Sequence, residues 1–424
     1  MGRFTGLIGI LLILGVAFLF SNNRKKINLR LVLSGLALQV FIAVMILQVK
    51  PVERFFTFLG RGMQKLEGFA KQGADFVYGG IASVSGSGIT QNYTAPGAFV
   101  FAFNVTATII LVCVLVAIFY YLGIMQRVVA GIARAMNFVM RVSGAEALSN
   151  VASAFVGQVE AQVMIRPYLK SMTRSELLAS MSGSLACISG GILIVYVNMG
   201  AQHGIDLAPK LIMASLMAAP GALVISKIVY PETEISPTRG RVKLQVKTEY
   251  SNLIDAISRG AADGFNIAMN VIAMLIGFIA LIALIDWCLL KAGHVFNPDF
   301  NLTLDWIFGK LFYPFAWAMG VPAEDIGNTA TLFGQKLTIN EFVAFSNMTG
   351  GKVPIVTEKG MLIASIAICG FANFSSVGMQ IGGIGALAPE RRKDLAQLGM
   401  RALLCGTLAS YLSAAIAGIL ATTP

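Results

Sequence analysis

Long apolar stretches, separated by short and mainly basic polar segments, run along the whole chain. About twenty consecutive apolar residues are enough for a helix to cross the hydrocarbon core of a bilayer. Eight such stretches are predicted, at residues 4–20, 31–48, 98–122, 176–199, 207–228, 261–290, 365–387 and 396–421. The pattern therefore predicts an all-α polytopic membrane protein with eight transmembrane helices.

One segment has a different period. From Lys50 to Gly79, Phe and Leu recur at helical spacing among Lys and Glu. An amphipathic pattern of this kind is typical of a helix that lies in the membrane interface. A loop rich in Gly, Ser and Thr is expected to follow it, up to about residue 97.

Composition narrows the class further. Hydrophobic residues make up 56% of the chain and charged residues 12%, with a mean hydropathy of +0.75. The net charge of +11 could suggest nucleic acid, but in a membrane protein Lys and Arg mark cytoplasmic loops, so we expect no nucleic-acid partner. The five cysteines have no metal-ligand spacing and only two histidines occur, which predicts no cofactor.

The basic segments also predict an orientation. "SNNRKKINLR" follows the first stretch and carries no acidic residue, so it should be cytoplasmic and the N-terminus outside. We expect the first stretch to be a retained span because no small-residue cleavage site precedes that segment. With eight spans, the C-terminus should also lie outside.

Two segments are too short to cross the membrane twice. Arg141 and Arg166 should both be cytoplasmic, yet only about two dozen residues separate them, and two crossings need about forty. This segment should lie on the surface or form a re-entrant hairpin, with "FVGQVEAQ" (155–162) near its tip. A similar segment at 321–354 contains Glu341. Each hairpin precedes a span interrupted by Gly, Ser or Asn, which predicts an inverted repeat with a binding site at the midplane.

Polar residues at the hairpin tips and helix breaks are the candidate site. They are Gln158, Glu160, Asn340, Glu341, Asn373, Ser375 and Ser376. Intramembrane carboxylates suggest function, and we expect these to have no basic partner. The set is rich in amides and acceptors, so it suits a neutral, hydroxyl-bearing solute better than an anion. The alternatives are glutamates that cap broken helices, and Asn and Ser that join neighbouring helices.

Several motifs, taken in order, resemble the concentrative nucleoside transporter family in its short bacterial form. They are "GQVEA" (157–161), "MLIGFIALIALI" (274–285), "NEFVAF" (340–345), "GFANFSS" (370–376) and "LAPERR" (387–392). The resemblance covers nearly the whole chain. It implies a homotrimer in the bacterial inner membrane that works by an elevator motion. Residues 1–142 and 229–292 would form the scaffold (229–292 includes a cytoplasmic loop), and 143–228 and 293–424 the two repeats of the transport domain.

The resemblance also implies roles for individual residues. Gln158 and Glu160 would face the nucleobase, with Val159 beside them and Ile192 as an apolar contact. Glu341, Asn373 and Ser376 would bind the ribose hydroxyls, with Asn340 next to Glu341 and Phe371 near the nucleoside. Many relatives have Thr where this chain has Val159 and Pro where it has Gln162, which leaves the preference between purines and pyrimidines open.

The coupling ion is the last expectation. The family's sodium site would fall on Ser153 and Cys187, where relatives have Asn and Ser, with carbonyls of Val156 and Ile188. A thiol is a poor ligand for a hard cation, and burial favours the protonated form of a carboxyl group, so that Glu160 or Glu341 could carry a proton. We therefore expect coupling to protons rather than sodium, although sodium held by carbonyls stays open.

The predicted function is import of nucleosides such as uridine by cation symport. Symport of another neutral hydroxylated solute or of a free nucleobase is the alternative. An intramembrane enzyme is disfavoured because the sequence has no Asp/His cluster, and a channel because two broken-helix hairpins do not form a pore filter.

Overall fold

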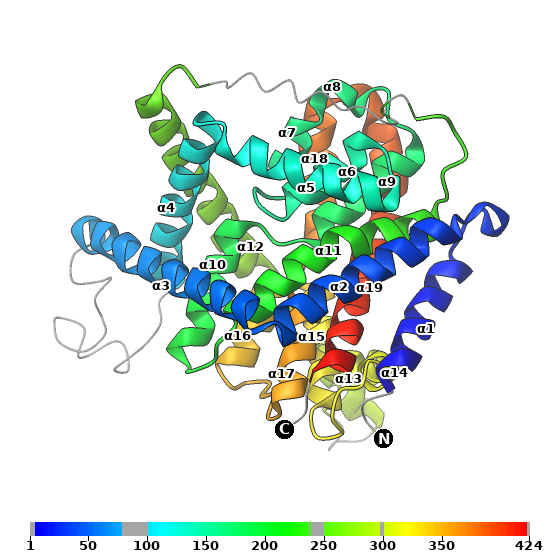
Figure 1. Ribbon diagram of the computed structural model, residues 1–424. Helices are drawn as coiled ribbons and strands as arrows, with labels where there is room; N and C mark the ends of the chain where they lie inside the picture. Colours follow the sequence, from blue (N-terminus) through cyan, green and yellow to red (C-terminus); the bar gives the residue numbers. More distant parts are fainter. Residues whose placement is uncertain (1–4, 79–100, 237, 239–249, 297–300, 422–424) are drawn as a thin grey trace.

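The computed structural model describes residues 5–78, 101–236, 238, 250–296 and 301–421, and the described chain is helical throughout (Figure 1). The longer helices are α1 (Thr5–Leu19), α2 (Leu29–Gln48), α3 (Lys50–Tyr78), α4 (Phe101–Tyr121), α5 (Ile124–Met140), α6 (Gly144–Ser153), α9 (Arg174–Ala186), α10 (Gly190–Gln202), α11 (Ala208–Val229), α12 (Leu253–Phe296), α15 (Ile326–Thr338), α17 (Glu358–Ile368), α18 (Phe374–Leu387) and α19 (Arg392–Leu420). Shorter helices are α7 (Glu160–Met164), α8 (Arg166–Leu169), α13 (Leu304–Leu311), α14 (Tyr313–Ala318) and α16 (Glu341–Thr349), with 3-10 turns η1 (Arg24–Lys26) and η3 (Pro389–Arg391). The expected all-helical architecture is confirmed.

Four helical segments of the described chain are long and apolar enough to cross a membrane: α2, α9 together with α10, α11, and η3 together with α19. A fifth is reached if α4 and α5 form one span, although the chain bends by 78° between them. The helices α1 and α18 are apolar but shorter. The described residues thus support a polytopic membrane protein, while the number of eight spans stays a prediction.

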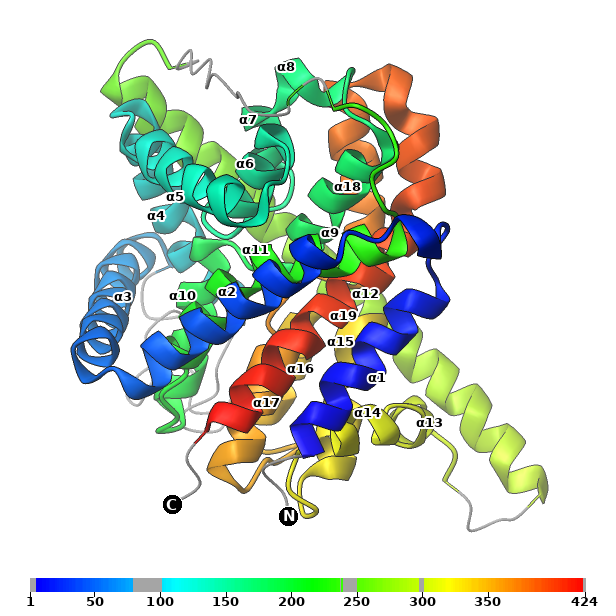
Figure 2. The same ribbon diagram turned by 45° about the vertical axis from the view of Figure 1, so that its right-hand side comes forward.

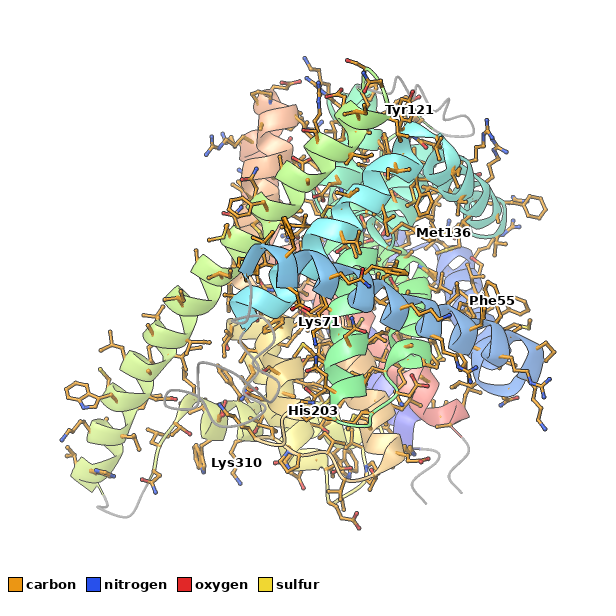
Figure 3. The ribbon with its side chains drawn as sticks, turned by 90° about the vertical axis from the view of Figure 1, so that its left-hand side faces the viewer. Phe55, Lys71, Tyr121, Met136, His203 and Lys310 are labelled. Carbon is orange, nitrogen blue, oxygen red and sulfur yellow. The ribbon has the colours of Figure 1, made fainter. Side chains whose placement is uncertain are left out.

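The amphipathic segment forms one helix, as predicted. α3 packs against α2, α4, α10 and α11, and Figure 3 shows it crossing this side of the molecule with Phe55 and Lys71 along its length. Phe58 and Phe76 are 71% and 91% exposed, whereas Ala70 and Ala74 are buried. Large exposed apolar side chains beside charged ones are the features expected of an interfacial helix.

The first hairpin is built from α6, a turn at 154–159, and α7. Ser143 and Glu146 form a capping box that starts α6, with the Ser143 N–H donating to Glu146 Oε1 at 2.7 Å. Gly157 at the turn has a φ of +125°, which only glycine adopts without strain. The carboxylate of Glu160 lies over it, 2.5 Å from the place of a Cβ on Gly157.

The second hairpin pairs α15 with α16. Asn340 is the N-cap of α16, and its side chain accepts a hydrogen bond from the Val343 N–H at 3.0 Å. Glu341 is therefore the first residue of that helix. The hairpin turns at Ile339 and Asn340, so Glu341 lies where the second of its two helices begins.

The two predicted helix breaks are present and touch each other. The first separates α9 from α10 at 187–189, and the second separates α17 from α18 at 369–373. The Phe371 N–H donates to the Cys187 carbonyl at 3.3 Å. A side chain on Gly370 would collide with the Ala186 carbonyl, so this glycine permits the close crossing.

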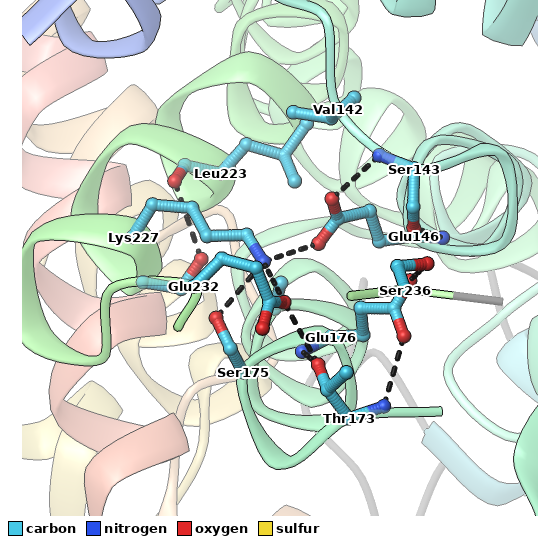
Figure 4. Close-up of polar contacts among 12 residues, drawn as sticks. Val142, Ser143, Glu146, Thr173, Ser175, Glu176, Leu223, Lys227, Glu232 and Ser236 are labelled. Atoms are coloured by element: carbon cyan, nitrogen blue, oxygen red, sulfur yellow. Dashed lines mark hydrogen bonds and ion pairs between the residues drawn. The ribbon is translucent and has the colours of Figure 1, made fainter. Parts of the chain in front are cut away.

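A buried cluster of charged and hydroxyl-bearing side chains lies where α6, α9 and α11 meet, and Figure 4 shows it in close-up. The Lys227 Nζ atom pairs with Glu146 at 2.8 Å and Glu232 at 3.3 Å, and donates to the Ser175 hydroxyl at 2.9 Å. Glu176, in a capping box with Thr173, accepts from the hydroxyls of Ser236 and Thr238. We call this set the Lys227 cluster: Glu146, Thr173, Ser175, Glu176, Lys227, Glu232, Ser236 and Thr238.

The Lys227 cluster fixes the base of the first hairpin. Its members come from the first turns of α6 and α9, the last turn of α11 and the segment after α11. Lys227 and Glu146 side chains are only 4% and 3% exposed. Their mutual bonds tie the hairpin to α9 and α11.

The first turn of α1 and the last turn of α19 lie at the same end of the helical body, opposite α7 and α8 (Figures 1 and 2). This agrees with both chain ends facing the same side.

Candidate functional site

Glu341 is the residue at which the second hairpin meets both broken helices. Its Oε1 atom accepts from the Tyr196 hydroxyl at 3.0 Å, and its Oε2 atom accepts from the Asn373 Nδ2 atom at 3.1 Å. Tyr196 belongs to α10 and Asn373 caps α18. Glu341 is 6% exposed, so the carboxylate lies in an oriented and nearly buried position.

Asn373 is itself held in one orientation. Its Oδ1 atom accepts from the Ser376 N–H and the Ser375 hydroxyl, each at 2.8 Å. With the oxygen engaged in capping α18, the amide nitrogen is left to face Glu341. The three predicted residues Glu341, Asn373 and Ser376 are thus brought together, Ser376 through its backbone.

Tyr196 was missed by the sequence analysis because it lies inside an apolar stretch. Its ring stacks on Phe345 at a centroid distance of 4.4 Å and lies 6.0 Å from Phe342. Both phenylalanines follow Glu341 on α16. This packing fixes the Tyr196 hydroxyl toward the carboxylate.

Glu341 has a buried basic residue as an electrostatic neighbour, which the sequence analysis did not expect. Lys336, on the last turn of α15, is fully buried and is an electrostatic neighbour of Glu341. No ion pair joins the two groups, and among the described residues the Lys336 Nζ atom has no hydrogen-bond partner. The sequence signal was present, since Lys336 precedes Glu341 by five residues.

The tip of the first hairpin packs against α18. Gln158 is 8% exposed, and its contacts are weak: it accepts from Gln380 at 3.5 Å and donates to the Met379 sulfur at 3.8 Å. Val159 lies against Gly383, where a side chain on the glycine would collide with it. Gln158 and Val159 therefore both pack against α18, the helix that Asn373 caps.

Glu160 differs from Glu341. It is exposed, and its carboxylate turns back over Gly157 and bonds to backbone groups of its own turn, at Val159 and Glu160. Ile192 and Phe371, next to the two helix breaks, are half-buried. Asn340 is 5% exposed and its side-chain oxygen is used in capping α16.

Three of the four residues considered for sodium, Ser153, Cys187 and Ile188, make hydrogen bonds within the protein through the atoms that would bind the ion. The Ser153 hydroxyl donates to the Ser149 carbonyl at 2.8 Å and lies 2.8 Å from the Ser184 hydroxyl. The Cys187 sulfur donates to the Asn150 carbonyl at 3.8 Å. The Ile188 carbonyl accepts from the Ser215 hydroxyl at 3.4 Å.

Gln162 completes this network. Its Nε2 atom donates to the Ser184 hydroxyl at 2.8 Å, and its Oε1 atom accepts from the Ser180 hydroxyl at 2.7 Å. Because Ser153 uses its proton on Ser149, Ser184 must donate to Ser153. The chain of bonds then runs in one direction from Ser180 to a backbone carbonyl. Sequence analysis singled out Gln162 only as a departure from relatives.

No cluster of three or more His, Cys, Asp or Glu side chains suited to a metal ion occurs within the described ranges. The candidate site instead combines hydroxyl, amide and carboxylate groups with aromatic rings. Such a site can orient a small polar solute through hydrogen bonds.

Comparison with known proteins defines the class. The model of the "Na+ dependent nucleoside transporter C-terminus" matches residues 210–418, that of its N-terminus matches 8–81, and a "nucleoside recognition" model matches 102–203. These matches, with the two hairpins and crossed helix breaks, define a transporter rather than an enzyme.

Full-length relatives agree. The chain is 38% identical to an uncharacterized transporter of Haemophilus influenzae, covering 99% of this chain and 98% of that one. It is 36% identical to the nucleoside permease NupC of Helicobacter pylori, with 97% and 96% covered. Against the sodium/nucleoside cotransporter 1 of Rattus norvegicus it is 36% identical, with 97% of this chain and 63% of the relative covered.

Solved structures give the same result. The transporter CNTnw in an inward-facing, substrate-bound state superposes with a TM-score of 0.89 at 38% identity, covering 99% of this chain and 98% of that one. A doubly substituted form of CNTnw in an outward-facing state gives 0.91 at the same identity and coverage. The chain belongs to the concentrative nucleoside transporter family.

Proposed function

We propose that this protein imports nucleosides such as uridine by proton symport across the bacterial inner membrane. The observation that carries the substrate class is the carboxylate of Glu341, oriented by Tyr196 and Asn373. A fixed carboxylate accepts strong hydrogen bonds from hydroxyl donors, and vicinal hydroxyls are what a ribose offers.

In this proposal, one hairpin tip binds the ribose of the nucleoside and the other binds its base. Glu341, Asn373 and Ser376 bind the ribose, with Asn340 supporting the start of α16. Gln158 and Glu160 bind the base, flanked by the apolar side chains Val159, Ile192 and Phe371. The weak present contacts of Gln158 support this role, because a ligand would replace them at little cost.

Proton coupling is supported by the hydrogen bonds around Ser153. Sodium prefers several oxygen ligands, and here the Ser153 hydroxyl and the Ile188 carbonyl already have protein partners. Cys187 offers only sulfur. The carbonyls of Val156 and Ile188 alone would make a poor site, because they supply only two oxygens.

The transport cycle follows from the family. The scaffold comprises residues 1–142 and 229–292, and the transport domain comprises 143–228 and 293–424. We propose that the transport domain moves as an elevator within a homotrimer embedded in the bilayer. The bonds of the Lys227 cluster support a first repeat that moves as one body.

The test is uptake of radiolabelled uridine into proteoliposomes, with unlabelled competitors. We expect cytidine or adenosine to compete, and uracil and ribose to compete poorly, because each carries half of the recognised groups. Competition by uracil alone at uridine-like concentrations would indicate a nucleobase transporter. Competition by ribose alone would indicate a sugar transporter.

A further inference from the structure

Lys336 is a buried cation without a partner. Its side chain is 0% exposed, and its Nζ atom makes no hydrogen bond within the part of the chain that the structure describes. Removing an ammonium group from water without compensation is costly. A methionine would fill a similar volume without this cost, so packing alone does not explain a lysine here.

One carboxylate and one helix end lie near Lys336. Its electrostatic neighbours are the carboxylate of Glu341 and the thiol of Cys369. Cys369 directly follows the last residue of α17, and the C-terminal end of a helix carries a partial negative charge. The ammonium therefore lies near both the site carboxylate and the end of the first half of a broken helix.

Glu341 needs such a cation. Its two hydrogen-bond donors, Tyr196 and Asn373, are both neutral. A carboxylate in a buried site loses its hydration and favours the protonated form unless a positive charge is near. A protonated carboxyl group would be a weaker acceptor and would turn one oxygen into a donor.

We infer that Lys336 is a positioning residue that acts through Glu341. Its charge keeps the carboxylate ionised, so that Glu341 reads the vicinal hydroxyls of the solute by charge-assisted hydrogen bonds. Lys336 does not touch the solute, because none of its surface is exposed. This inference rests on the proposed function and assigns to it a specificity-determining residue outside the binding surface.

The experiment measures discrimination rather than activity. The affinities for uridine and 2′,3′-dideoxyuridine are measured by calorimetry on the purified full-length protein, and their ratio is compared among variants. We expect the ratio to fall about fivefold or more in Lys336→Met, since hydrogen bonds to charged groups are roughly twice as strong as neutral ones. Lys336→Arg, which keeps the charge, should retain the wild-type ratio.

Lys227→Met is the matched control, because it also removes a buried ammonium. It should disturb folding but leave the ratio unchanged in the protein that folds. A second control uses the background Glu341→Gln, in which adding Lys336→Met should change the ratio little. Non-additivity of this kind is the sign of two residues acting as one unit.

Each failure has a distinct meaning. If the wild-type protein does not distinguish uridine from 2′,3′-dideoxyuridine, the proposed reading of ribose by Glu341 is overturned. If it does and Lys336→Met does so equally, only the inference about Lys336 is overturned. If Lys336→Met fails to fold, the neutral pair Lys336→Met/Glu341→Gln should fold, and a pair that fails too would assign Lys336 to packing.

Discussion

Lys227 and Lys336 are the two buried lysines of the described chain, and their surroundings are opposite. Lys227 is bonded to Glu146, Glu232 and the Ser175 hydroxyl, whereas Lys336 has no bonded partner there. A buried cation whose bonds are all made within the protein holds elements together. One left without them is kept for another reason, and here it lies next to the carboxylate of the candidate site.

The same contrast separates the hydrogen-bond networks. Around Ser153, Gln162 and Ser184 the bonds form a continuous chain within the protein. Around Gln158 they are long and weak. Side chains whose hydrogen bonds are all made within the protein thus hold the hairpins in place. Side chains with long, weak bonds are the ones that a solute can engage.

The largest expected effect is on stability, from a substitution in the Lys227 cluster. Lys227→Met should destabilise the protein by about 3–5 kcal/mol, because removing one partner leaves buried carboxylates uncompensated. Thermal unfolding in detergent checks this as a marked fall in Tm. Lys336→Met should lower Tm far less, since it removes a charge that has no bonded partner. Equal losses in both variants would contradict the comparison.

The next effect is on binding. Glu341→Gln should weaken uridine binding by roughly ten- to a hundredfold, because a hydrogen bond to a charged group contributes about 1.5–3 kcal/mol. Calorimetry on the purified variant is the measurement. An affinity close to that of the wild type would remove Glu341 from the ribose site, and an unchanged Tm would show that the fold is intact.

A smaller effect is expected at the residue that the sequence analysis missed. Tyr196→Phe removes one neutral hydrogen bond to Glu341 while keeping the ring that stacks on Phe345. The loss should be about 0.5–1.5 kcal/mol of uridine binding, and Phe345→Leu provides a control for the ring contact. Weakening as strong as that of Glu341→Gln would mean that Tyr196 contacts the solute directly.

The smallest effect concerns selectivity. Val159→Thr adds one hydroxyl group at the tip of the first hairpin and leaves the region of Lys336 and Glu341 untouched. The order of affinities among uridine, cytidine and adenosine should change, while discrimination against deoxynucleosides stays constant. If the order is unchanged, Val159 does not line the base site.

Much of the frame could be predicted from the sequence. The apolar stretches predicted the helical membrane class, and the amphipathic period predicted α3. Gly, Ser and Asn inside apolar stretches predicted both helix breaks. Residues 142–165 were too few to cross the membrane twice, and this predicted the first hairpin. These features depend on local composition and length, and local composition is visible in the sequence.

The rest depends on contacts between distant segments. Tyr196 reaches Glu341 across 145 positions and Gln380 reaches Gln158 across 222, so neither was foreseen. The expected span at 98–122 ends where the chain bends, but the helix that follows, α5, was not predicted, because Arg127 and Arg134 interrupt its apolar pattern. Lys336 was overlooked although it is near Glu341 in sequence, because a lysine in a polar tip segment does not look buried.

The most direct test of the account is the coupling ion. Uridine uptake into proteoliposomes is measured under an imposed pH gradient without sodium, and then under a sodium gradient at equal pH. The closed hydrogen bonds at Ser153, Cys187 and Ile188 predict accumulation driven by the pH gradient and little response to sodium. Accumulation that requires sodium and ignores the pH gradient would contradict the account.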